Sequence, residues 1–347
     1  MTDLRLQPDD ILDRAHVVAL PMRVTFRGIN TRELMLFDGP AGWAEWSPFP
    51  EYEPAEAKRW LDCALEMGFH GAPAPLRDRV AVNATVPAVD VEANPDTVPL
   101  LLERYPGCRT VKVKVAERGQ SLLHDVARVR HVRHWFESQG IDVALRVDAN
   151  GGWSVDEALI AITALADTGP IDYVEQPCQT IDELAAVRAG LQERGLGIDS
   201  STPVRIAADE LIRKASDPMA VVRAGACDVA VVKAAPLGGP SSVVNVANHI
   251  AEYSVPVTVS SALESAVGMG AGIAAAAAIP ATDGEPHAAG LATGSLFVHD
   301  VTEPRRIVDG HLDVAPVVPD PARLAEFAVE SSRRDWWFNR LQLAWNA

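Results

Sequence analysis

From residue 80 onward the chain alternates short apolar runs with longer amphipathic segments, and this alternation restricts the fold more than any other feature. The apolar runs are rich in valine, isoleucine and alanine, as expected of strands that are covered on both faces. They are residues 80–86, 110–115, 143–147, 171–174, 204–207, 229–232 and 255–259. The segments with helical spacing between them include 122–137, 154–166, 181–191 and 241–253. This order predicts a parallel sheet whose strands are connected by helices.

The number of strands decides between a closed barrel and an open sheet. Seven strands, with a weak eighth expected near residues 287–291, fit a (β/α) barrel. An open dinucleotide-binding sheet needs a glycine-rich turn after its first strand, and residues 87–90 (Pro-Ala-Val-Asp) provide none. The alanine- and glycine-rich stretch 266–281 is too short to span a bilayer and is expected to form a buried helix.

The residues before this alternation have a different pattern. Residues 1–79 contain three short strands and a helix that begins at Pro54, which together predict a small α+β capping domain. The expected strands are 14–22, 33–37 and 42–46. The tail, 301–347, is expected to pack on that domain. The predicted fold class is therefore α/β: a modified (β/α)8 TIM barrel over residues 80–300 with a capping domain built from both ends of the chain.

Composition limits the partners. With 31 basic and 47 acidic residues the 347-residue chain has a net charge of −16, which argues against nucleic acid or an anionic membrane as a partner. The four cysteines have no CxxC spacing and are expected to be reduced thiols in a cytoplasmic protein. The first ten residues are polar and acidic, unlike a signal peptide. The sequence leaves the oligomeric state open.

Three consecutive barrel strands are followed or ended by an acid, namely Asp148, Glu175 and Asp209. The carboxyl ends of parallel barrel strands meet at one rim, so these carboxylates would lie close together and need a cation. Oxygen ligands without nearby His or Cys favour Mg²⁺ first and Mn²⁺ second, whereas a zinc barrel needs imidazole ligands, and no HxH or HExxH motif occurs. Glu210 could replace Asp209 as the ligand, and Asn150 is expected beside the metal ligands. The alternative is three unrelated turn or helix-cap residues.

Three lysines accompany these acids. Lys112 and Lys114 are two apart on a strand and therefore point the same way, and Lys233 follows the sixth strand. A solvated lysine face on an edge strand, and a simple ion pair for Lys233, are the plainer interpretations. With the acids present, the set indicates removal of a proton next to a substrate carboxylate, with an amine as the base. Lys112 and the metal should disfavour the charged form of Lys114 and make it a better base.

In this arrangement the chain resembles the enolase superfamily, which pairs catalytic lysine with magnesium. The resemblance rests on Lys112-Val113-Lys114 on strand two, acids on strands three to five and Lys233 on strand six, and it covers nearly the whole chain. The lysine on strand six is similar to the muconate-lactonizing subgroup rather than to mandelate racemase. Within that subgroup, segments 20–28, 228–239 and 260–265 are similar to actinobacterial members of the o-succinylbenzoate synthase family.

The resemblance implies a carbon–oxygen lyase of menaquinone biosynthesis. Its reaction would be the syn dehydration of 2-succinyl-6-hydroxy-2,4-cyclohexadiene-1-carboxylate to 2-succinylbenzoate. By position, it implies Mg²⁺ ligands at Asp148, Glu175 and Asp209. It also implies that Lys114 removes the proton and returns it to the departing hydroxyl. Lys233 would stabilise the enediolate from the opposite face, and Lys112 would tune Lys114.

A dicarboxylate substrate needs donors besides the metal. Ser260 and Ser261 offer hydroxyls and the N-terminus of a following helix, or they merely cap that helix. Arg27 could lie in a capping loop over the barrel mouth and bind the anion, whereas Arg23 is better explained as an exposed strand charge. Gly238, in a tight strand-to-helix turn after Lys233, is a further candidate for substrate contact.

Two alternatives stay open. N-succinylamino-acid racemases, dipeptide epimerases and muconate cycloisomerases use the same metal and lysine pair, so the motifs do not separate them from a dehydratase. A non-catalytic ligand-binding barrel is the alternative of another class. The mutually repulsive acids argue against it, because a chain freed from catalysis has no reason to keep them.

Overall fold

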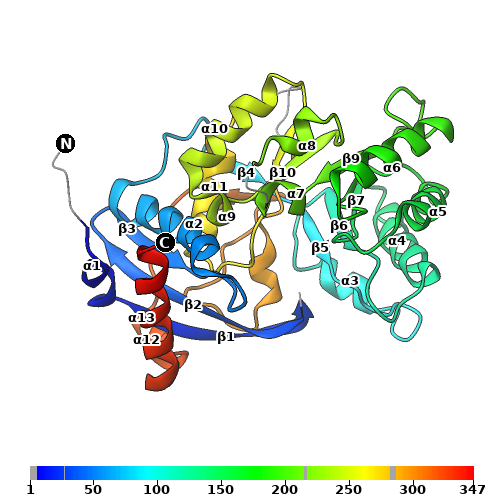
Figure 1. The fold of residues 1–347 in the computed structure, drawn as a ribbon. Helices are drawn as coiled ribbons and strands as arrows, with labels where there is room; N and C mark the ends of the chain where they lie inside the picture. The colour runs from blue at the N-terminus through cyan, green and yellow to red at the C-terminus, as the bar shows by residue number, and fades with distance from the viewer. Residues whose placement is uncertain (1–5, 27, 215–216, 282–286) are drawn as a thin grey trace.

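A computed structural model describes residues 6–26, 28–214, 217–281 and 287–347 of the chain. The N-terminal part is an antiparallel sheet in the order β1-β2-β3, shown in blue in Figure 1. Its strands are β1 (His16–Phe26), β2 (Ile29–Gly39) and β3 (Gly42–Trp46). β1 and β2 extend beyond the predicted runs: their pairing is regular from His16 to Pro21, passes through an irregular stretch and resumes where Phe26 pairs with Ile29.

Helices from both ends of the chain cover this sheet (Figure 1). They are α1 (Pro8–Leu12), α2 (Pro54–Leu65), which continues as a π-helical turn at Glu66–His70, α12 (Pro321–Glu326) and α13 (Ser331–Trp345). Trp46 of β3, Trp60 of α2 and Trp337 of α13 are almost completely buried, and the rings of Trp46 and Trp337 meet edge to face at 5.5 Å. The C-terminal tail thus shares a core with the N-terminal sheet.

The main sheet is parallel and has the order β11-β10-β9-β8-β7-β6-β5 among the described residues. Its strands are β5 (Ala84–Val86), β6 (Thr110–Lys114), β7 (Ala144–Asp148), β8 (Tyr173–Glu175), β9 (Arg205–Ala208), β10 (Val229–Val232) and β11 (Val257–Val259). The segment predicted as a weak eighth strand closes it through two parallel bridges, Val82 to Ala289 and Ser260 to Gly290. The strands are short and apolar because helices cover the outside of the sheet.

Helices follow the strands in sequence, and the longer ones lie outside the curled sheet in Figure 1. They are α3 (Thr97–Leu102), α4 (Leu122–Glu137), α5 (Val155–Ala166), α6 (Ile181–Glu193), α7 (Glu210–Arg213), α8 (Ala220–Arg223), α9 (Ala234–Leu237), α10 (Pro240–Ala251) and α11 (Met269–Ala278). A 3-10 turn, η2 (Thr293–Leu296), follows the closing segment. Ser154 and Thr180 each start a helix with a capping box, which fixes where α5 and α6 begin.

Two sequence predictions need correction. The run 80–86 is not one strand: β4 (Arg79–Ala81) leaves the barrel and pairs antiparallel with β12 (His311–Asp313), a partner far away in the sequence. The buried helix expected over 266–281 is shorter, because the backbone up to Gly268 forms a loop and α11 begins only at Met269. Within the ranges described, no helix is long and apolar enough to cross a membrane.

Candidate active site at the barrel rim

Parallel register brings the predicted site residues to one level. Lys114 of β6 is paired with Asp148 of β7, and Asp148 with Glu175 of β8. Asp209 and Lys233 directly follow β9 and β10 and serve as the N-cap residues of α7 and α9. A small cavity of about 40 Å³, here called the rim cavity, opens at this level. It is lined by Thr85, Lys112, Lys114, Asp148, Asn150, Asp209, Glu210, Arg213, Lys233, Ser260, Ser261, Ala262, Leu263, Gly290 and Thr293.

Both lysines of β6 converge on one carboxylate. Lys114 Nζ lies 2.5 Å from Asp148 Oδ2 and donates to Asn150 Oδ1 at 2.7 Å. Lys112 Nζ lies 3.3 Å from the same Asp148 oxygen and 3.0 Å from Glu175 Oε2. The two side chains therefore share a face of the strand, as their spacing predicts. Glu175 is fully buried and lies outside the lining of the rim cavity.

The opposite side of the rim cavity carries Lys233 and an arginine that the sequence interpretation missed. Lys233 Nζ lies 2.5 Å from Asp209 Oδ2. Arg213 Nε lies 3.2 Å from Asp209 Oδ1, and its Nη2 lies 2.8 Å from Glu210 Oε1. Arg213 follows Asp209 by four residues, one helical turn, and this spacing was a signal that could have revealed it. Asn150 Nδ2 reaches Glu210 Oε1 at 3.4 Å, so Asn150 and Glu210 lie beside the acids as expected.

The three carboxylates differ in proton affinity. Burial raises the pKa of Asp148, but Lys114 and Lys112 outweigh it and hold that pKa below its ordinary value. Burial likewise raises the pKa of Asp209, but the positive charges of Lys233 and Arg213 outweigh this effect and hold that pKa below its ordinary value. For Glu175, burial and the neighbouring Asp148 prevail over Lys112 and raise its pKa to about 7. Two of the three acids are thus held as carboxylates by the cations beside them.

The buried lysines also differ. Burial lowers the pKa of Lys112, yet Glu175 and Asp148 overcome this effect and hold that pKa above its ordinary value. Burial also lowers the pKa of Lys233, and here the single close acid, Asp209, does not compensate because Arg213 adds a positive charge nearby. Lys112 is therefore fixed as an ammonium group, while the pKa of Lys233 lies below its ordinary value although Lys233 is paired with Asp209.

The donor chemistry fits a hard divalent cation. The acids offer only oxygen atoms, and the buried Asp209 Oδ1 and Glu210 Oε2 accept no hydrogen bond within the described chain. In the arrangement described, however, lysine ammonium groups lie against the acids, and no three His, Cys, Asp or Glu side chains of the described ranges are grouped closely enough to hold a metal as they stand. Asp148, Glu175 and Asp209 are the residues that would hold Mg²⁺ here.

The serines predicted to bind substrate line the rim cavity. Ser261 Oγ lies 2.6 Å from Thr293 Oγ1 and accepts a hydrogen bond from the Leu263 amide at 3.0 Å. The helix expected directly after Ser260 and Ser261 begins only at Met269, so neither serine caps it and its N-terminus does not adjoin them. That part of the prediction is wrong, because residues up to Gly268 form a loop held by the N-terminal sheet.

The other candidates lie elsewhere. Gly238 ends α9 with a left-handed φ of 92° and does not belong to the lining of the rim cavity. A Cβ added there would make only ordinary contacts, at 3.6 Å to Ser242 Oγ and 3.9 Å to the Arg59 carbonyl oxygen of α2, so the left-handed φ of the turn is what favours glycine. Arg23 is exposed and donates to the Val298 carbonyl at 3.3 Å. Arg27 lies outside the described residues.

The N-terminal sheet fixes the loop that carries the serines, a role that sequence reasoning missed. Arg32 of β2 is buried and its Nε donates to the Leu263 carbonyl at 3.0 Å. Glu45 of β3 accepts hydrogen bonds from the Ser265 amide at 3.0 Å and from Ser47 Oγ at 2.6 Å. Burial raises the pKa of Glu45 to about 7. No local pattern signals the contacts of Arg32 with Leu263 and of Glu45 with Ser265, because the partners are more than 200 residues apart.

Comparison with known families places these features in context. Residues 100–320 match the family model described as enolase C-terminal domain-like, and residues 17–68 match enolase N-terminal domain-like. A protein named o-succinylbenzoate synthase from Mycolicibacterium smegmatis is 57% identical over 333 residues, 96% of this chain and 95% of that protein. One of the same name from Mycobacterium leprae is 52% identical over 337 residues, 97% of this chain and 93% of that protein.

Solved structures support the same fold. A muconate lactonizing enzyme from Pseudomonas fluorescens, complexed with muconolactone, superposes with a TM-score of 0.72 at 19% identity over 91% of this chain and 98% of that one. The enzyme of that type from Pseudomonas putida gives a TM-score of 0.70 at 20% identity with the same coverage. From the family matches and the full-length relatives, the chain is a member of the enolase superfamily and, within it, of the o-succinylbenzoate synthase family.

Proposed function

We propose that this enzyme catalyses the Mg²⁺-dependent syn dehydration of 2-succinyl-6-hydroxy-2,4-cyclohexadiene-1-carboxylate to 2-succinylbenzoate, a step of menaquinone biosynthesis in the cytoplasm. The observation that carries the proposal is that Lys114 and Lys233 line one rim cavity together with Asp148 and Asp209. The name of the full-length relatives supports the substrate. The four cysteines are free and buried, which agrees with a reducing compartment.

Lys114 acts as the base. Its amine takes the proton from the carbon next to the ring carboxylate, and negative charge moves onto the carboxylate oxygens to give an enediolate. Lys114 then returns this proton to the departing hydroxyl, which leaves as water while the ring becomes aromatic. One residue suffices for both transfers because a syn elimination uses a single face of the ring. Asn150, which accepts from Lys114 at 2.7 Å, orients the amine.

Positive charge stabilises the enediolate from the other side. Lys233 supplies an ammonium group across the rim cavity from Lys114. When bound by Asp148, Glu175 and Asp209, Mg²⁺ supplies further positive charge for the substrate carboxylate. Lys112 stays charged between Asp148 and Glu175, and its charge would tune Lys114 on the same face of β6.

The second carboxylate of the substrate, on the succinyl chain, needs its own donors. Ser260, Ser261 and Thr293 provide hydroxyl groups on one wall of the rim cavity, and we assign the succinyl carboxylate to this wall. Arg27 stays a candidate from the sequence for the same carboxylate. The left-handed φ of Gly238 at the end of α9 favours a structural role for it instead.

In domain terms, residues 1–79 and 301–347 would form the cap and residues 80–300 the catalytic barrel. The contacts of Arg32 and Glu45 with the loop after β11 support a cap that shapes the substrate wall. In this arrangement the capping domain contributes to specificity and the barrel contributes the chemistry.

The lysine pair also favours a second candidate activity. Racemisation or epimerisation of an N-succinylamino acid or a dipeptide needs a base on each face of the substrate, and Lys114 and Lys233 flank one cavity. The surroundings of Lys233 lower its pKa, which would suit a residue that exchanges protons with the substrate.

The direct experiment offers the cyclohexadiene substrate to the purified protein with Mg²⁺ and follows the aromatic product by absorbance. We expect product formation by the wild-type chain and none by Lys114→Ala. Racemisation of N-succinylphenylalanine is measured in parallel. Turnover of that amino acid without any aromatic product would replace the dehydratase by the racemase, and absence of both reactions would favour the non-catalytic barrel.

A further inference from the structure

A second and larger cavity lies behind the segment that closes the barrel. Its volume is about 620 Å³, and none of the site residues predicted from the sequence lines it. We call it the outer cavity. The two cavities share a wall: Gly290 and Thr293 face the rim cavity, whereas Leu291 and Gly294 face the outer cavity. A volume of this size is typical of sites for small organic ligands.

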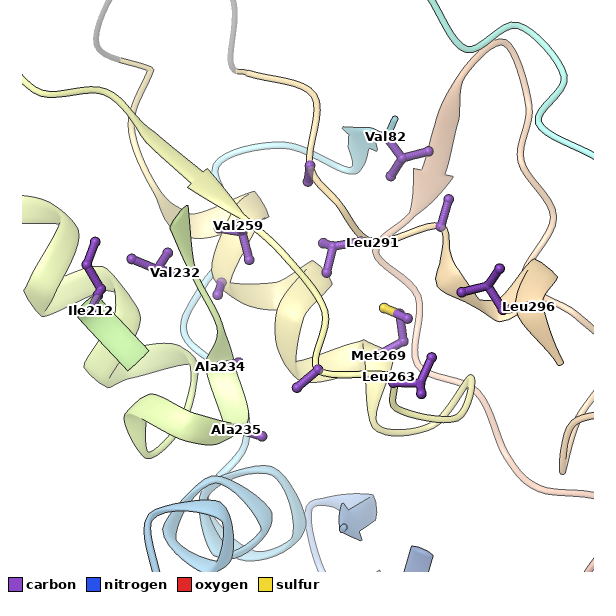
Figure 2. Close-up of a cluster of buried hydrophobic side chains, with 14 of the residues drawn as sticks. Val82, Ile212, Val232, Ala234, Ala235, Val259, Leu263, Met269, Leu291 and Leu296 are labelled. Atoms are coloured by element: carbon purple, nitrogen blue, oxygen red, sulfur yellow. The ribbon is translucent and has the colours of Figure 1, made fainter. Parts of the chain in front are cut away.

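The floor of the outer cavity is apolar. Met269 and Leu291 are almost fully buried in the hydrophobic core, and Leu312 lines the cavity beside them. Figure 2 shows Met269 and Leu291 in one cluster with Leu263, which lines the rim cavity. The floor is therefore a rigid continuation of the barrel core, able to receive an apolar body of a ligand.

Arginines form the polar part of the lining. Arg305 is held in place: its Nε donates to the Ala266 carbonyl at 2.7 Å and its Nη1 to the Ala315 carbonyl at 3.0 Å. A Cβ added at Gly270 would lie only 3.3 Å from Arg305 Nη2, so the glycine leaves room for the guanidinium. Arg104 and Arg306 line the same cavity and are exposed.

The acids of the lining do not cancel this charge. The carboxylate of Asp300 is buried and accepts hydrogen bonds from the Ala266 amide at 2.9 Å and the Val301 amide at 2.7 Å. Asp309 is the other acid, and it is exposed at the edge. Three guanidinium groups against two carboxylates leave a positive site on a chain with a net charge of −16. Such a local reversal of sign attracts an anion.

We propose that the outer cavity binds a small amphipathic carboxylate, with its apolar body on Met269 and Leu291 and its carboxylate at Arg305 and Arg306. Arginine suits this role because its planar guanidinium pairs with a carboxylate through two hydrogen bonds. The lining offers little for a sugar or a nucleotide, since its floor is apolar. The site is independent of the dehydratase chemistry and would persist if that assignment failed.

The test uses 2-naphthoate as the probe and the full chain without added metal, with binding measured by isothermal titration calorimetry. We expect one equivalent to bind the wild type, about tenfold weaker binding to Arg306→Met, and unchanged binding to Arg130→Met, which removes an exposed arginine of α4. Lys114→Ala should bind as the wild type does, because it alters only the rim cavity.

Gly294→Phe provides the steric test. An added Cβ at Gly294 meets no atom within 4 Å, so a larger side chain is accommodated by filling the outer cavity. Binding should be lost while the melting temperature stays close to that of the wild type. Undiminished binding by a folded Gly294→Phe variant, equal weakening in Arg306→Met and Arg130→Met, or no binding to the wild type at millimolar probe would each overturn the proposal.

Discussion

The carboxylates buried at the barrel rim and those buried between the N-terminal sheet and the barrel have different partners. At the rim cavity, each acid lies against a cation: Asp148 against Lys114, and Asp209 against Lys233. At the interface between the N-terminal sheet and the barrel, Glu45 is held by Ser265 and Ser47, and Glu264 accepts from the Ala262 amide at 2.8 Å. The first region pairs opposite charges and the second satisfies its acids with neutral donors.

This difference distinguishes the reactive site from the structural interface. At the rim, ammonium groups keep the pKa of Asp148 and of Asp209 low, so these oxygens stay available to a cation. At the interface, burial prevails and raises the pKa of both Glu45 and Glu264. A carboxyl group that is neutral can be buried at a contact between domains without a counter-charge. At the rim, ion pairs hold the pKa of two acids low, whereas at the interface burial outweighs the hydrogen bonds from neutral donors and raises the pKa of both glutamates. Glu175, buried beside the rim, resembles the interface acids in that its pKa is raised to about 7.

The largest effect is expected from Lys114→Ala. Removing the general base should lower kcat by at least about 10³-fold, since proton transfer by a positioned side chain typically contributes 10²–10⁴ and the amine serves two transfers. The rate of aromatic product formation measures it, with circular dichroism as the control for folding. Turnover near the wild-type rate in the folded variant would remove Lys114 as the base.

Glu45→Gln sharpens the comparison from the interface side. A folded-state pKa of about 7 against an ordinary value of 4.5 means that the folded chain holds a proton that the unfolded chain releases in this range. The contribution of Glu45 to stability is therefore fully present below pH 4.5 and is lost as the pH rises through 7, a change of about 3 kcal/mol. Glu45→Gln has no ionisable group at this position, so its stability does not fall with pH for this reason.

Urea denaturation at pH 5 and pH 8 measures this contribution of Glu45. The difference between the two pH values should be smaller by about 2.5 kcal/mol in Glu45→Gln than in the wild type, because pH 5 already lies above the ordinary pKa of 4.5. Glu252→Gln, at an exposed site after α10, is the matched control and should follow the wild type. Equal pH dependence of all three proteins would show that Glu45 is charged in the interface.

Lys233→Arg distinguishes the role of Lys233 from that of Lys114. Arginine keeps the positive charge but does not exchange a proton at neutral pH, so dehydration should persist with about a tenfold lower kcat while any racemase activity is lost. Both activities are assayed on the same preparation. Equal loss of both would mean that Lys233 does more than supply charge.

Ser261→Ala should give the smallest effect. Its hydroxyl lies 2.6 Å from Thr293 Oγ1 on the wall assigned to the succinyl carboxylate. Loss of one hydrogen bond of about 1 kcal/mol predicts a KM several-fold higher with kcat nearly unchanged. A fall in kcat with unchanged KM would instead place Ser261 near the reacting atoms.

The sequence predicted those features that depend on local pattern. The strand ends, the shared face of Lys112 and Lys114 and the level of the acids follow from strand periodicity and the parallel order, and they are confirmed as positions in the fold. The pairing of β4 with β12 and the contact of Arg32 with Leu263 could not be predicted. Both join residues more than 200 apart, and nothing in either segment alone specifies its partner.

A titration of chelator-treated protein with Mg²⁺ by isothermal titration calorimetry tests most directly whether the rim acids bind a cation. We predict one bound equivalent for the wild type and for Glu252→Gln. We predict none for Asp209→Asn, because this change removes the carboxylate whose Oδ1 accepts no hydrogen bond in the wild type. No Mg²⁺ binding by the folded wild type, or equal binding by Asp209→Asn, would contradict the account.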